Sequence, residues 1–343
     1  MPDNPMDDAP VLRVRNLVTE YTVRTGAGLI QRRKPLRAVD DVSFDLGRGE
    51  TLGLVGESGC GKSSLAKTLL RLVPASSGSI TFEGTSLTDL SHKRMRSLRR
   101  DIQVIFQDPF TSLNPRMKVS RIISEPWEIF PDTVPADRRE ERVSELLHQV
   151  GLNAGDKDRF PHQFSGGQRQ RIGIARALAV EPKLIVCDEP VSALDVSVQA
   201  QVVNLLQDIQ KRLGLSYVFI SHDLSVVRHI ADRVAVMYLG KIVEIGDVDQ
   251  VYDAPFHPYT QALISAVPDS ERGREESTAR RIILEGDVPS PLDPPSGCRF
   301  RTRCWKAVER CAVEQPELRV RPRTGHASAC HFAEPAPILK GAR

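Results

Sequence analysis

The chain has 343 residues, of which 40% are hydrophobic, so it can form a large core and more than one domain. Its 47 Lys and Arg residues nearly balance its 44 Asp and Glu residues, and this net charge of +3 gives no sign of a nucleic-acid-binding surface. The acidic, polar residues 1–8 do not resemble a signal peptide, and no apolar run approaches the roughly 20 residues that cross a bilayer. We therefore expect a soluble, cytosolic protein.

The first hundred residues predict strands around one glycine-rich loop. Residues 11–14 and 42–46 alternate in the manner of half-buried strands. Residues 51–55 form a short apolar strand that leads into residues 56–63, and these match the phosphate-binding pattern G-x-x-x-x-G-K-[ST]. Leu65, Leu69 and Leu72 are then expected on one side of a helix. A loop between a strand and a helix favours phosphate binding over a chance glycine-rich turn.

Each residue of this loop has an expected part in binding a nucleotide. The backbone N–H groups surround the phosphates, the Lys62 ammonium reaches the β- and γ-phosphates, and the Ser63 hydroxyl can coordinate Mg²⁺. The expected nucleotide-binding residues of the loop are Gly56, Glu57, Ser58, Gly59, Cys60, Gly61, Lys62, Ser63 and Ser64.

Helical sequence interrupted by proline follows from about residue 108 to residue 161. Asp137 is expected to cap a helix, with Glu140 three residues later. Val143, Leu146, Leu147 and Val150 supply the apolar side of that helix, and Gly151 ends it. Beyond this region, residues 184–187 and 217–220 are apolar runs typical of buried strands in a parallel sheet.

Polar side chains follow these strands and are candidates for catalysis. Asp188 can hold hydrated Mg²⁺, and the adjacent Glu189 can deprotonate or orient the attacking water, although paired acids at a strand end are often a solvated turn. His222 could contact the γ-phosphate, although a histidine after a strand is more often structural. Gln107, at the end of another strand, can contact Mg²⁺ and water; its alternative is a surface turn.

A second phosphate-binding device lies at residues 164–169. The turn Ser165-Gly166-Gly167-Gln168 leads into a helix, and the unpaired N–H groups and positive dipole of a helix N-terminus bind anions. Because the chain has a single phosphate loop of the first kind, we expect this turn to serve a nucleotide held by another subunit.

The chain resembles the ATPase subunits of ABC transporters over about residues 11–253. The resemblance rests on six motifs that follow one another along the chain in that family's order: the phosphate loop, Gln107, residues 165–168, residues 188–189, residues 192–195 and His222. The resemblance implies an α/β P-loop NTPase with a RecA-like parallel-sheet core, an antiparallel β subdomain and a helical subdomain at about 108–161. It also implies a head-to-tail dimer that holds two ATP molecules with Mg²⁺. Asp195 would lie where the subunits meet, and Tyr21 would stack on adenine, the alternative for Tyr21 being simple strand packing.

Within that family the chain looks like the oligopeptide/dipeptide permeases. Residues 106–115 resemble that subfamily's glutamine loop, and residues 257–263 resemble its C-terminal motif; the chain is closer to the F-type than to the D-type ATPase. This resemblance implies a D-type partner, two transmembrane permease subunits, an extracytoplasmic substrate-binding protein, and a place on the cytoplasmic face of the membrane. Peptide is the expected cargo; importers of nickel, glutathione or sugars have similar ATPases.

The last quarter of the chain differs in composition, with eleven of the 24 prolines and four of the six cysteines from Pro255 onward. We expect a nucleotide-binding domain over 1–255 and an extension over 256–343. Cys298, Cys304, Cys311 and Cys330 suit an iron–sulfur cluster or tetrahedral Zn²⁺ that staples a segment too small for its own core. Related peptide-permease ATPases hold a [4Fe–4S] cluster there, which favours iron. Cys60 and Cys187 are expected to be packing residues. His326 and His331 are expected to be bystanders, the alternative being that they substitute for a cysteine as metal ligands.

Other functions fit less well. A chromosome or DNA-repair ATPase would have a long coiled-coil insertion, and a translation factor would have two cassettes. An iron–sulfur sensor stays open as an alternative, with the cysteines as its working site. Five Lys and Arg residues within 92–100 are expected on a solvated helix surface.

Overall fold

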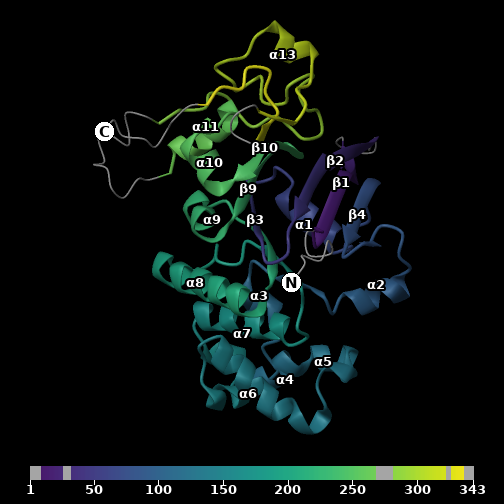
Figure 1. The fold of residues 1–343 in the computed structure, drawn as a ribbon, viewed down its shortest axis with the longest axis vertical. Coiled ribbons are helices and arrows are strands. Elements are labelled where there is room, and N and C mark those ends of the chain that lie inside the picture. The colour runs from purple at the N-terminus through teal and green to yellow at the C-terminus, as the bar shows by residue number, and fades with distance from the viewer. Residues whose placement is uncertain (1–8, 26–31, 268–280, 322–325, 336–343) are drawn as a thin grey trace, which may run out of the picture. The chain divides into compact units, whose positions relative to one another are not determined.

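The computed structural model describes residues 9–25, 32–267, 281–321 and 326–335 (Figure 1). The chain divides into two compact units that each draw on separated segments. The first unit comprises residues 46–51 and 83–221 with the N-terminal segment up to Val11, and the second comprises residues 12–45, 52–82 and 222–343. The predicted boundary near residue 255 stays a prediction.

The first unit combines three parallel strands with most of the helices. Its elements are β5 (Thr85–Ser86), α2 (His92–Leu98), β6 (Ile102–Ile105), α3 (Pro109–Ser112), α4 (Val119–Ser124), α5 (Pro126–Ile129), α6 (Arg139–Gln149), α7 (Gly166–Leu178), β7 (Leu184–Asp188), α8 (Val196–Leu213) and β8 (Ser216–Ile220), with 3₁₀ turns at Pro131–Thr133, Ala136–Arg138, Ala154–Asp158 and Pro161–Gln163.

Strand β7 pairs in parallel with β6 on one side and β8 on the other. Every residue of β8 is buried, and so are the first four of β7. This confirms the two predicted buried strands and explains their continuous apolar sequence, since strands covered on both faces have no polar side. The last residue of β7, Asp188, lies opposite Ile220, so the polar residues that follow emerge at the carboxyl edge of these strands.

Helices α3, α4 and α6 lie within the predicted helical region of residues 108–161, and each packs against α7, which follows that region (Figure 1). Trp127 is fully buried there, and its indole N–H donates to the carbonyl of Ala179 at 2.7 Å. Val143, Leu146, Leu147 and Val150 are buried as predicted.

The predicted start of α6 at Asp137 is wrong. Asp137 lies in the 3₁₀ turn Ala136–Arg138, and α6 begins at Arg139 without a side-chain cap. The turn after Pro135 leads directly into the helix, so no capping aspartate is needed, and Glu140 and Glu141 complement the helix dipole instead. The predicted end is confirmed, because Gly151 adopts the left-handed conformation (φ 72°) just after the helix.

The second unit contains two groups of strands and the C-terminal extension. Its elements are β1 (Leu12–Thr25), β2 (Arg32–Leu46), β3 (Thr51–Val55), α1 (Lys62–Leu69), β4 (Ser77–Phe82), α9 (Leu224–Ile230), β9 (Arg233–Tyr238), β10 (Lys241–Asp247), α10 (Val248–Asp253), α11 (Pro258–Ser265), α13 (Glu309–Val313), β11 (Arg319–Val320) and β12 (Ala327–Ser328).

Strands β2, β1 and β4 lie side by side, with β1 and β4 antiparallel, as expected for an antiparallel β subdomain. In the other group β3 pairs in parallel with β9, β9 turns back into β10, and the extension adds β12 and then β11 beyond β10. The prediction for Leu72 is wrong: α1 ends at Leu69, Arg71 turns the chain with φ 50°, and Leu72 is 54% exposed.

A buried polar cluster attaches the extension to β10. The Glu244 carboxylate is completely buried and accepts hydrogen bonds from the N–H groups of Phe256 at 2.6 Å and His257 at 2.8 Å. Its Oε1 also lies 2.9 Å from Nε2 of His326, which is equally buried. His326 therefore helps to attach the extension to β10.

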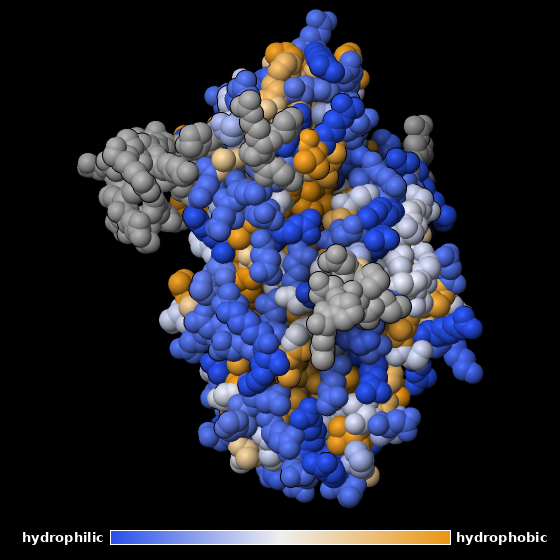
Figure 2. Space-filling model, in the orientation of Figure 1, coloured by the Kyte–Doolittle hydropathy of each residue, from blue (hydrophilic) through white to orange (hydrophobic). Residues whose placement is uncertain are grey.

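The visible surface is mostly hydrophilic, with hydrophobic side chains in small groups (Figure 2). Helix α2 buries only Met95, so the basic run is a solvated helix surface as predicted. Among the described residues, no helix is both long enough and apolar enough to span a membrane.

Candidate functional site

In the second unit, the phosphate loop has a backbone shape that requires glycine. Gly56, Gly59 and Gly61 have φ values of 153°, 78° and 112°. A Cβ atom on Gly56 would lie 2.2 Å from the carbonyl oxygen of Met237, and one on Gly61 would lie 2.1 Å from that of Ala38. Both the torsions and the close backbone approach therefore exclude other residues. The loop ends at the first turn of α1, where helix N–H groups and the helix dipole attract anions.

Lys62 is buried at the centre of this loop. Its ammonium donates to the carbonyl oxygens of Gly56 at 2.6 Å and Glu57 at 3.0 Å. The cation is thus held beside the loop by neutral acceptors, and among the residues that the structure describes no carboxylate forms an ion pair with it. An arrangement of one cation, a helix N-terminus and a glycine backbone suits a polyphosphate.

Cys60 is buried as predicted for a packing residue. Burial raises the pKa of its thiol, and the neighbouring Lys62 only partly offsets this effect. The thiol is therefore protonated at neutral pH and a poor nucleophile. Cys187, within β7, is fully buried and has a raised pKa for the same reason.

In the first unit, Glu189 follows β7 with a left-handed backbone, φ 49°. Its N–H donates to the carbonyl of Ile220 at 3.0 Å, and its own carbonyl accepts from the Ser192 hydroxyl at 3.1 Å. The side-chain amide of Gln107, two residues beyond β6, donates to Glu189 Oε2 at 3.1 Å. The structure thus brings together two predicted site residues, and a strained backbone aims the carboxylate. Such strain is typical of functional sites, and the residues around position 189 do not predict it.

Two other predicted site residues lie in the second unit. His222 is exposed and lies two residues after the end of β8. Tyr21 is half-buried in β1. Their roles in catalysis and adenine stacking stay predictions.

The second predicted phosphate device is a well-formed helix start in the first unit. Ser165 caps α7: its hydroxyl accepts from the N–H of Gln168 at 3.3 Å, and Gln168 Oε1 accepts from the N–H of Ser165 at 3.0 Å. A Cβ on Gly167 would lie 2.3 Å from Val198 Cγ1 of α8 and one on Gly166 would lie 3.2 Å from Leu194 Cδ2. Glycine therefore allows α8 to approach the turn closely. Asp195 precedes α8, and the adjacent Val196 is 82% exposed.

Within the second unit, all four C-terminal cysteines line one small cavity, together with His257, Phe300 and His331. None of the four is in a disulfide. Burial raises the pKa of Cys298 to about 11 and also raises the pKa values of Cys304 and Cys330. Thiolates here therefore need a compensating cation. Among the described residues, no three Cys, His, Asp or Glu side chains are close enough together to hold a metal ion. The four cysteines thus line the same cavity, but their side chains are not placed close enough together to bind one metal ion as they stand.

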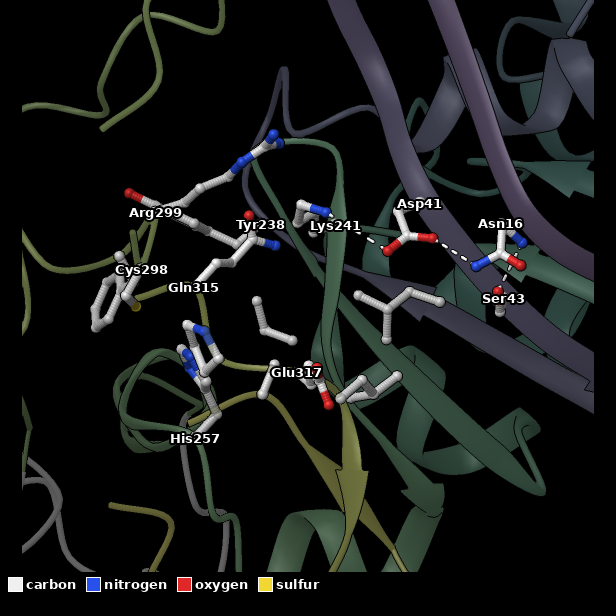
Figure 3. A pocket seen from close by; sticks show the side chains of 16 residues that line it. Asn16, Asp41, Ser43, Tyr238, Lys241, His257, Cys298, Arg299, Gln315 and Glu317 are labelled. Carbon is white, nitrogen blue, oxygen red and sulfur yellow. Dashed lines mark hydrogen bonds and ion pairs between the residues drawn. The ribbon is translucent and has the colours of Figure 1, made fainter. Parts of the chain in front are cut away.

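A larger cavity of about 410 Å³ adjoins this one and shares Cys298, His257 and Phe300 with it (Figure 3). At its other end, the Asn16 amide donates to Asp41 Oδ1 at 2.7 Å, and both residues have left-handed backbones. Cys298 is therefore accessible from an open cavity.

Sequence reasoning missed two residues that contact the phosphate loop. Tyr259 Oη accepts the N–H of Glu57 at 2.9 Å, and the Arg303 guanidinium pairs with the Glu57 carboxylate. The motif at residues 257–263 gave a clue to Tyr259, but nothing in the sequence pairs residue 303 with residue 57.

The fold and the phosphate loop define the class of ABC-type nucleotide-binding proteins. Residues 39–192 match the family model described as "ABC transporter". Among solved structures, cbiO1 from Clostridium perfringens, part of the ABC transporter complex cbiONQ, has a TM-score of 0.62 and 30% identity, covering 71% of this chain and 91% of that one. The cassette MJ0796 bound to ADP and Pi has a TM-score of 0.60 and 26% identity, covering 69% of this chain and 98% of its own.

The C-terminal extension identifies a smaller group within the ABC-type nucleotide-binding proteins. Residues 243–311 match the model for the C-terminal region of oligopeptide/dipeptide transporters. The oligopeptide transport ATP-binding protein AppF of Bacillus subtilis (strain 168) is 51% identical over 324 residues, 94% of this chain and 97% of AppF. Its counterpart OppF of Haemophilus influenzae (strain KW20 / Rd) is 53% identical over 307 residues, 89% of this chain and 92% of OppF. The chain belongs to the oligopeptide/dipeptide transporter ATP-binding proteins, an ABC ATPase family.

Proposed function

We propose that the chain is the ATP-hydrolysing subunit of a peptide importer. The observation that carries the proposal is the phosphate loop, whose three glycines and uncancelled Lys62 charge form a cradle for a polyphosphate. The close similarity to AppF and OppF, whose names state oligopeptide transport, supports peptide as the cargo.

In this proposal the site residues act as follows. Lys62 neutralises the β- and γ-phosphates, and Ser63 and Asp188 bind Mg²⁺. Glu189 is the general base for the attacking water, and Gln107 orients both the carboxylate and the water. His222 contacts the γ-phosphate. The supporting geometry is the hydrogen bond between Gln107 and Glu189 on a backbone that fixes the carboxylate.

The Ser165-Gly166-Gly167 turn is proposed to bind the γ-phosphate held by a partner subunit's phosphate loop. The capping of α7 by Ser165 preserves the helix start, and the exposed Val196 beside Asp195 offers an apolar contact for that partner. We propose a D-type ATPase as this partner. The pair would lie at the cytoplasmic face of the membrane beneath two permease subunits, which a substrate-binding protein supplies.

Purification of the whole transporter with its binding protein tests this function. Mass spectrometry of the retained ligand should find peptides, and adding them should stimulate ATP hydrolysis. Retention of nickel or glutathione would overturn peptide as the cargo and leave ATP hydrolysis intact. Failure of the purified complex to hydrolyse MgATP would overturn the proposal as a whole.

We further propose that Cys298, Cys304, Cys311 and Cys330 bind a [4Fe–4S] cluster, with Zn²⁺ as the alternative. The support is their convergence on one cavity from positions up to 32 residues apart, all as free thiols. Thiolate sulfur suits both groups. The cluster would cross-link a segment that has few buried apolar residues. Iron and sulfide analysis with visible absorption of anaerobically purified protein distinguishes the two: four irons per chain with broad visible absorption supports the cluster, and zinc alone overturns it.

If the cysteines are instead a sensor, replacing Cys304 with Ser removes a redox response and leaves transport intact. If the cysteines instead stabilise the extension by binding a metal group, the same change impairs assembly of the transporter.

A further inference from the structure

Glu57, the second residue of the phosphate loop, is held by the C-terminal extension at two points. The Arg303 guanidinium binds the Glu57 carboxylate through both nitrogens, with Nη1–Oε2 at 2.8 Å and Nη2–Oε1 at 3.1 Å. Tyr259 Oη accepts the Glu57 N–H at 2.9 Å. All three residues belong to the second unit. The extension therefore contacts both the side chain and the backbone of a residue in the nucleotide cradle.

The contact of Arg303 and Tyr259 with Glu57 is rigid. The side chains of Arg303 and Glu57 are 8% and 26% exposed, so solvent screens the ion pair weakly. A planar, two-point pair fixes direction as well as distance, which a lysine could not do. Tyr259 is fully buried, and its ring lies 4.7 Å from that of Tyr238 and 5.4 Å from that of Phe300. Its hydroxyl therefore has little freedom to move.

The restraint bears directly on Lys62. The Lys62 ammonium binds the carbonyl oxygens of Gly56 and Glu57, on either side of the N–H that Tyr259 holds. Fixing the peptide between residues 56 and 57 fixes the first of these carbonyls, and fixing the Glu57 side chain limits rotation toward the second. The extension thus helps to set the position of the cation that the phosphates meet.

Arg303 lies in a short segment between two of the cysteines, Cys298 and Cys304. Cys298 and Cys304 enclose a compact turn in which the Arg301 N–H donates to the Cys298 carbonyl at 3.1 Å and the Arg303 N–H to the Phe300 carbonyl at 3.0 Å. Cys298 is in turn tied to Cys311 by a backbone hydrogen bond at 2.8 Å. The position of Arg303 therefore depends on how the cysteine segment is folded.

We propose that Arg303 and Tyr259 are positioning residues of the nucleotide site, through which the cysteine segment sets the affinity for ATP. This inference rests on the proposed binding of ATP at the phosphate loop. It gives the extension a role in nucleotide binding and not only in stability.

The test measures the dissociation constant of MgATPγS for the purified full-length chain by calorimetry. Arg303→Gln should weaken binding by about tenfold, which corresponds to about 1.4 kcal/mol, and Arg303→Lys should recover part of the loss. The matched control is Arg301→Gln, since Arg301 lies in the same turn but its guanidinium donates to the carbonyl and the hydroxyl of Ser296. Its dissociation constant should stay within twofold of the wild type.

A double-mutant cycle separates positioning from a general effect on the fold. Glu57→Gln should weaken binding as Arg303→Gln does, and the double variant should be no weaker than either single one. Additive losses, or equal binding by Arg303→Gln and wild type, overturn the inference. Should Arg303→Gln fail to fold, Tyr259→Phe decides: it keeps the ring and should weaken binding about threefold to tenfold, and unchanged binding overturns the proposal.

The link to the cysteines has its own readout. Cys304→Ser should weaken MgATPγS binding in the wild-type background and cause no further loss in Arg303→Gln. Unchanged binding in Cys304→Ser overturns that link. Absence of binding by the wild-type chain refutes instead the proposed ATP site, so the two failures are distinguishable.

Discussion

Replacement of Glu189 with Gln separates catalysis from folding in this protein. Gln has the same size and the same Cβ, so the left-handed backbone at residue 189 is equally strained in both proteins. The amide oxygen can still accept the hydrogen bond from Gln107 that now measures 3.1 Å to Oε2. We therefore expect the free energy of unfolding to change by less than about 0.5 kcal/mol.

Turnover should change far more, because an amide cannot accept the proton of the attacking water. Loss of a general base lowers the rate by about 10²–10⁴-fold, which adds roughly 3–5 kcal/mol to the barrier. ATP should still bind, since Lys62 and the loop glycines are untouched. The variant should accumulate as an ATP-bound dimer of nucleotide-binding subunits.

Phosphate release by the assembled transporter at saturating ATP measures turnover, and size-exclusion chromatography with MgATP detects the dimer. Glu181→Gln is a matched control, because Glu181 also has a left-handed backbone (φ 55°) in the same unit but pairs with Arg142 at the surface. Turnover by Glu189→Gln within threefold of the wild type would refute the assignment of the general base.

Three further predictions concern packing and charge. Gly167→Ala should lower the free energy of unfolding in urea by about 1–3 kcal/mol, because the new Cβ atom collides with Val198. Gly173→Ala in the same helix is the control: its Cβ atom has no neighbour within 4 Å, so this change should stabilise the protein. Equal effects of the two substitutions would contradict the prediction. Glu244→Leu should cost about 3–5 kcal/mol by leaving buried N–H groups and His326 unpaired; a smaller loss than in Glu83→Gln would contradict it. At Glu83, burial opposes ionisation but hydrogen bonds from Lys183 and Arg48 outweigh it and lower the pKa. The ion pairs therefore stabilise the folded protein above the unfolded pKa of about 4.5, and this stabilisation is lost as the pH falls. In thermal unfolding, Glu83→Gln should be less stable than the wild type at pH 7 and should match it near pH 3. A difference in stability that stays constant with pH would count against the ion pairs.

Local sequence predicted the parts whose determinants are local. The strand that leads into the phosphate loop, the buried strands β7 and β8, and the helix start at residues 165–168 each depend on residues within about ten positions of one another, and the structure confirms these elements. The sequence placed Gln107 and Glu189 after strands, and because β6 and β7 are parallel neighbours the structure brings the two side chains together, a contact that was not predicted.

The sequence-based predictions were wrong or incomplete where the local structure depends on residues far apart in the chain or on an alternative type of turn. Asp137 has the sequence of a helix cap, yet a 3₁₀ turn after Pro135 makes the cap unnecessary. The pairs Arg303–Glu57 and His326–Glu244 join residues 246 and 82 positions apart, and each partner alone is an ordinary polar residue. The left-handed backbone of Glu189 occurs together with a hydrogen bond from its N–H to the carbonyl of Ile220 in the neighbouring strand, and the residues around position 189 do not indicate that contact.

The pairing of β12 with β10 has a consequence for attempts to shorten the chain. Strand β10 is almost wholly buried, and Ala327 and Ser328 occupy the hydrogen-bonding edge opposite Ile245 and Glu244. A protein that ended before residue 256 would present that apolar edge, with its unpaired N–H and C=O groups, to other molecules. Such a protein should self-associate through β10 when overproduced. We therefore expect the extension to protect the edge of β10 from aggregation, and a soluble minimal cassette to need charged or proline substitutions along β10.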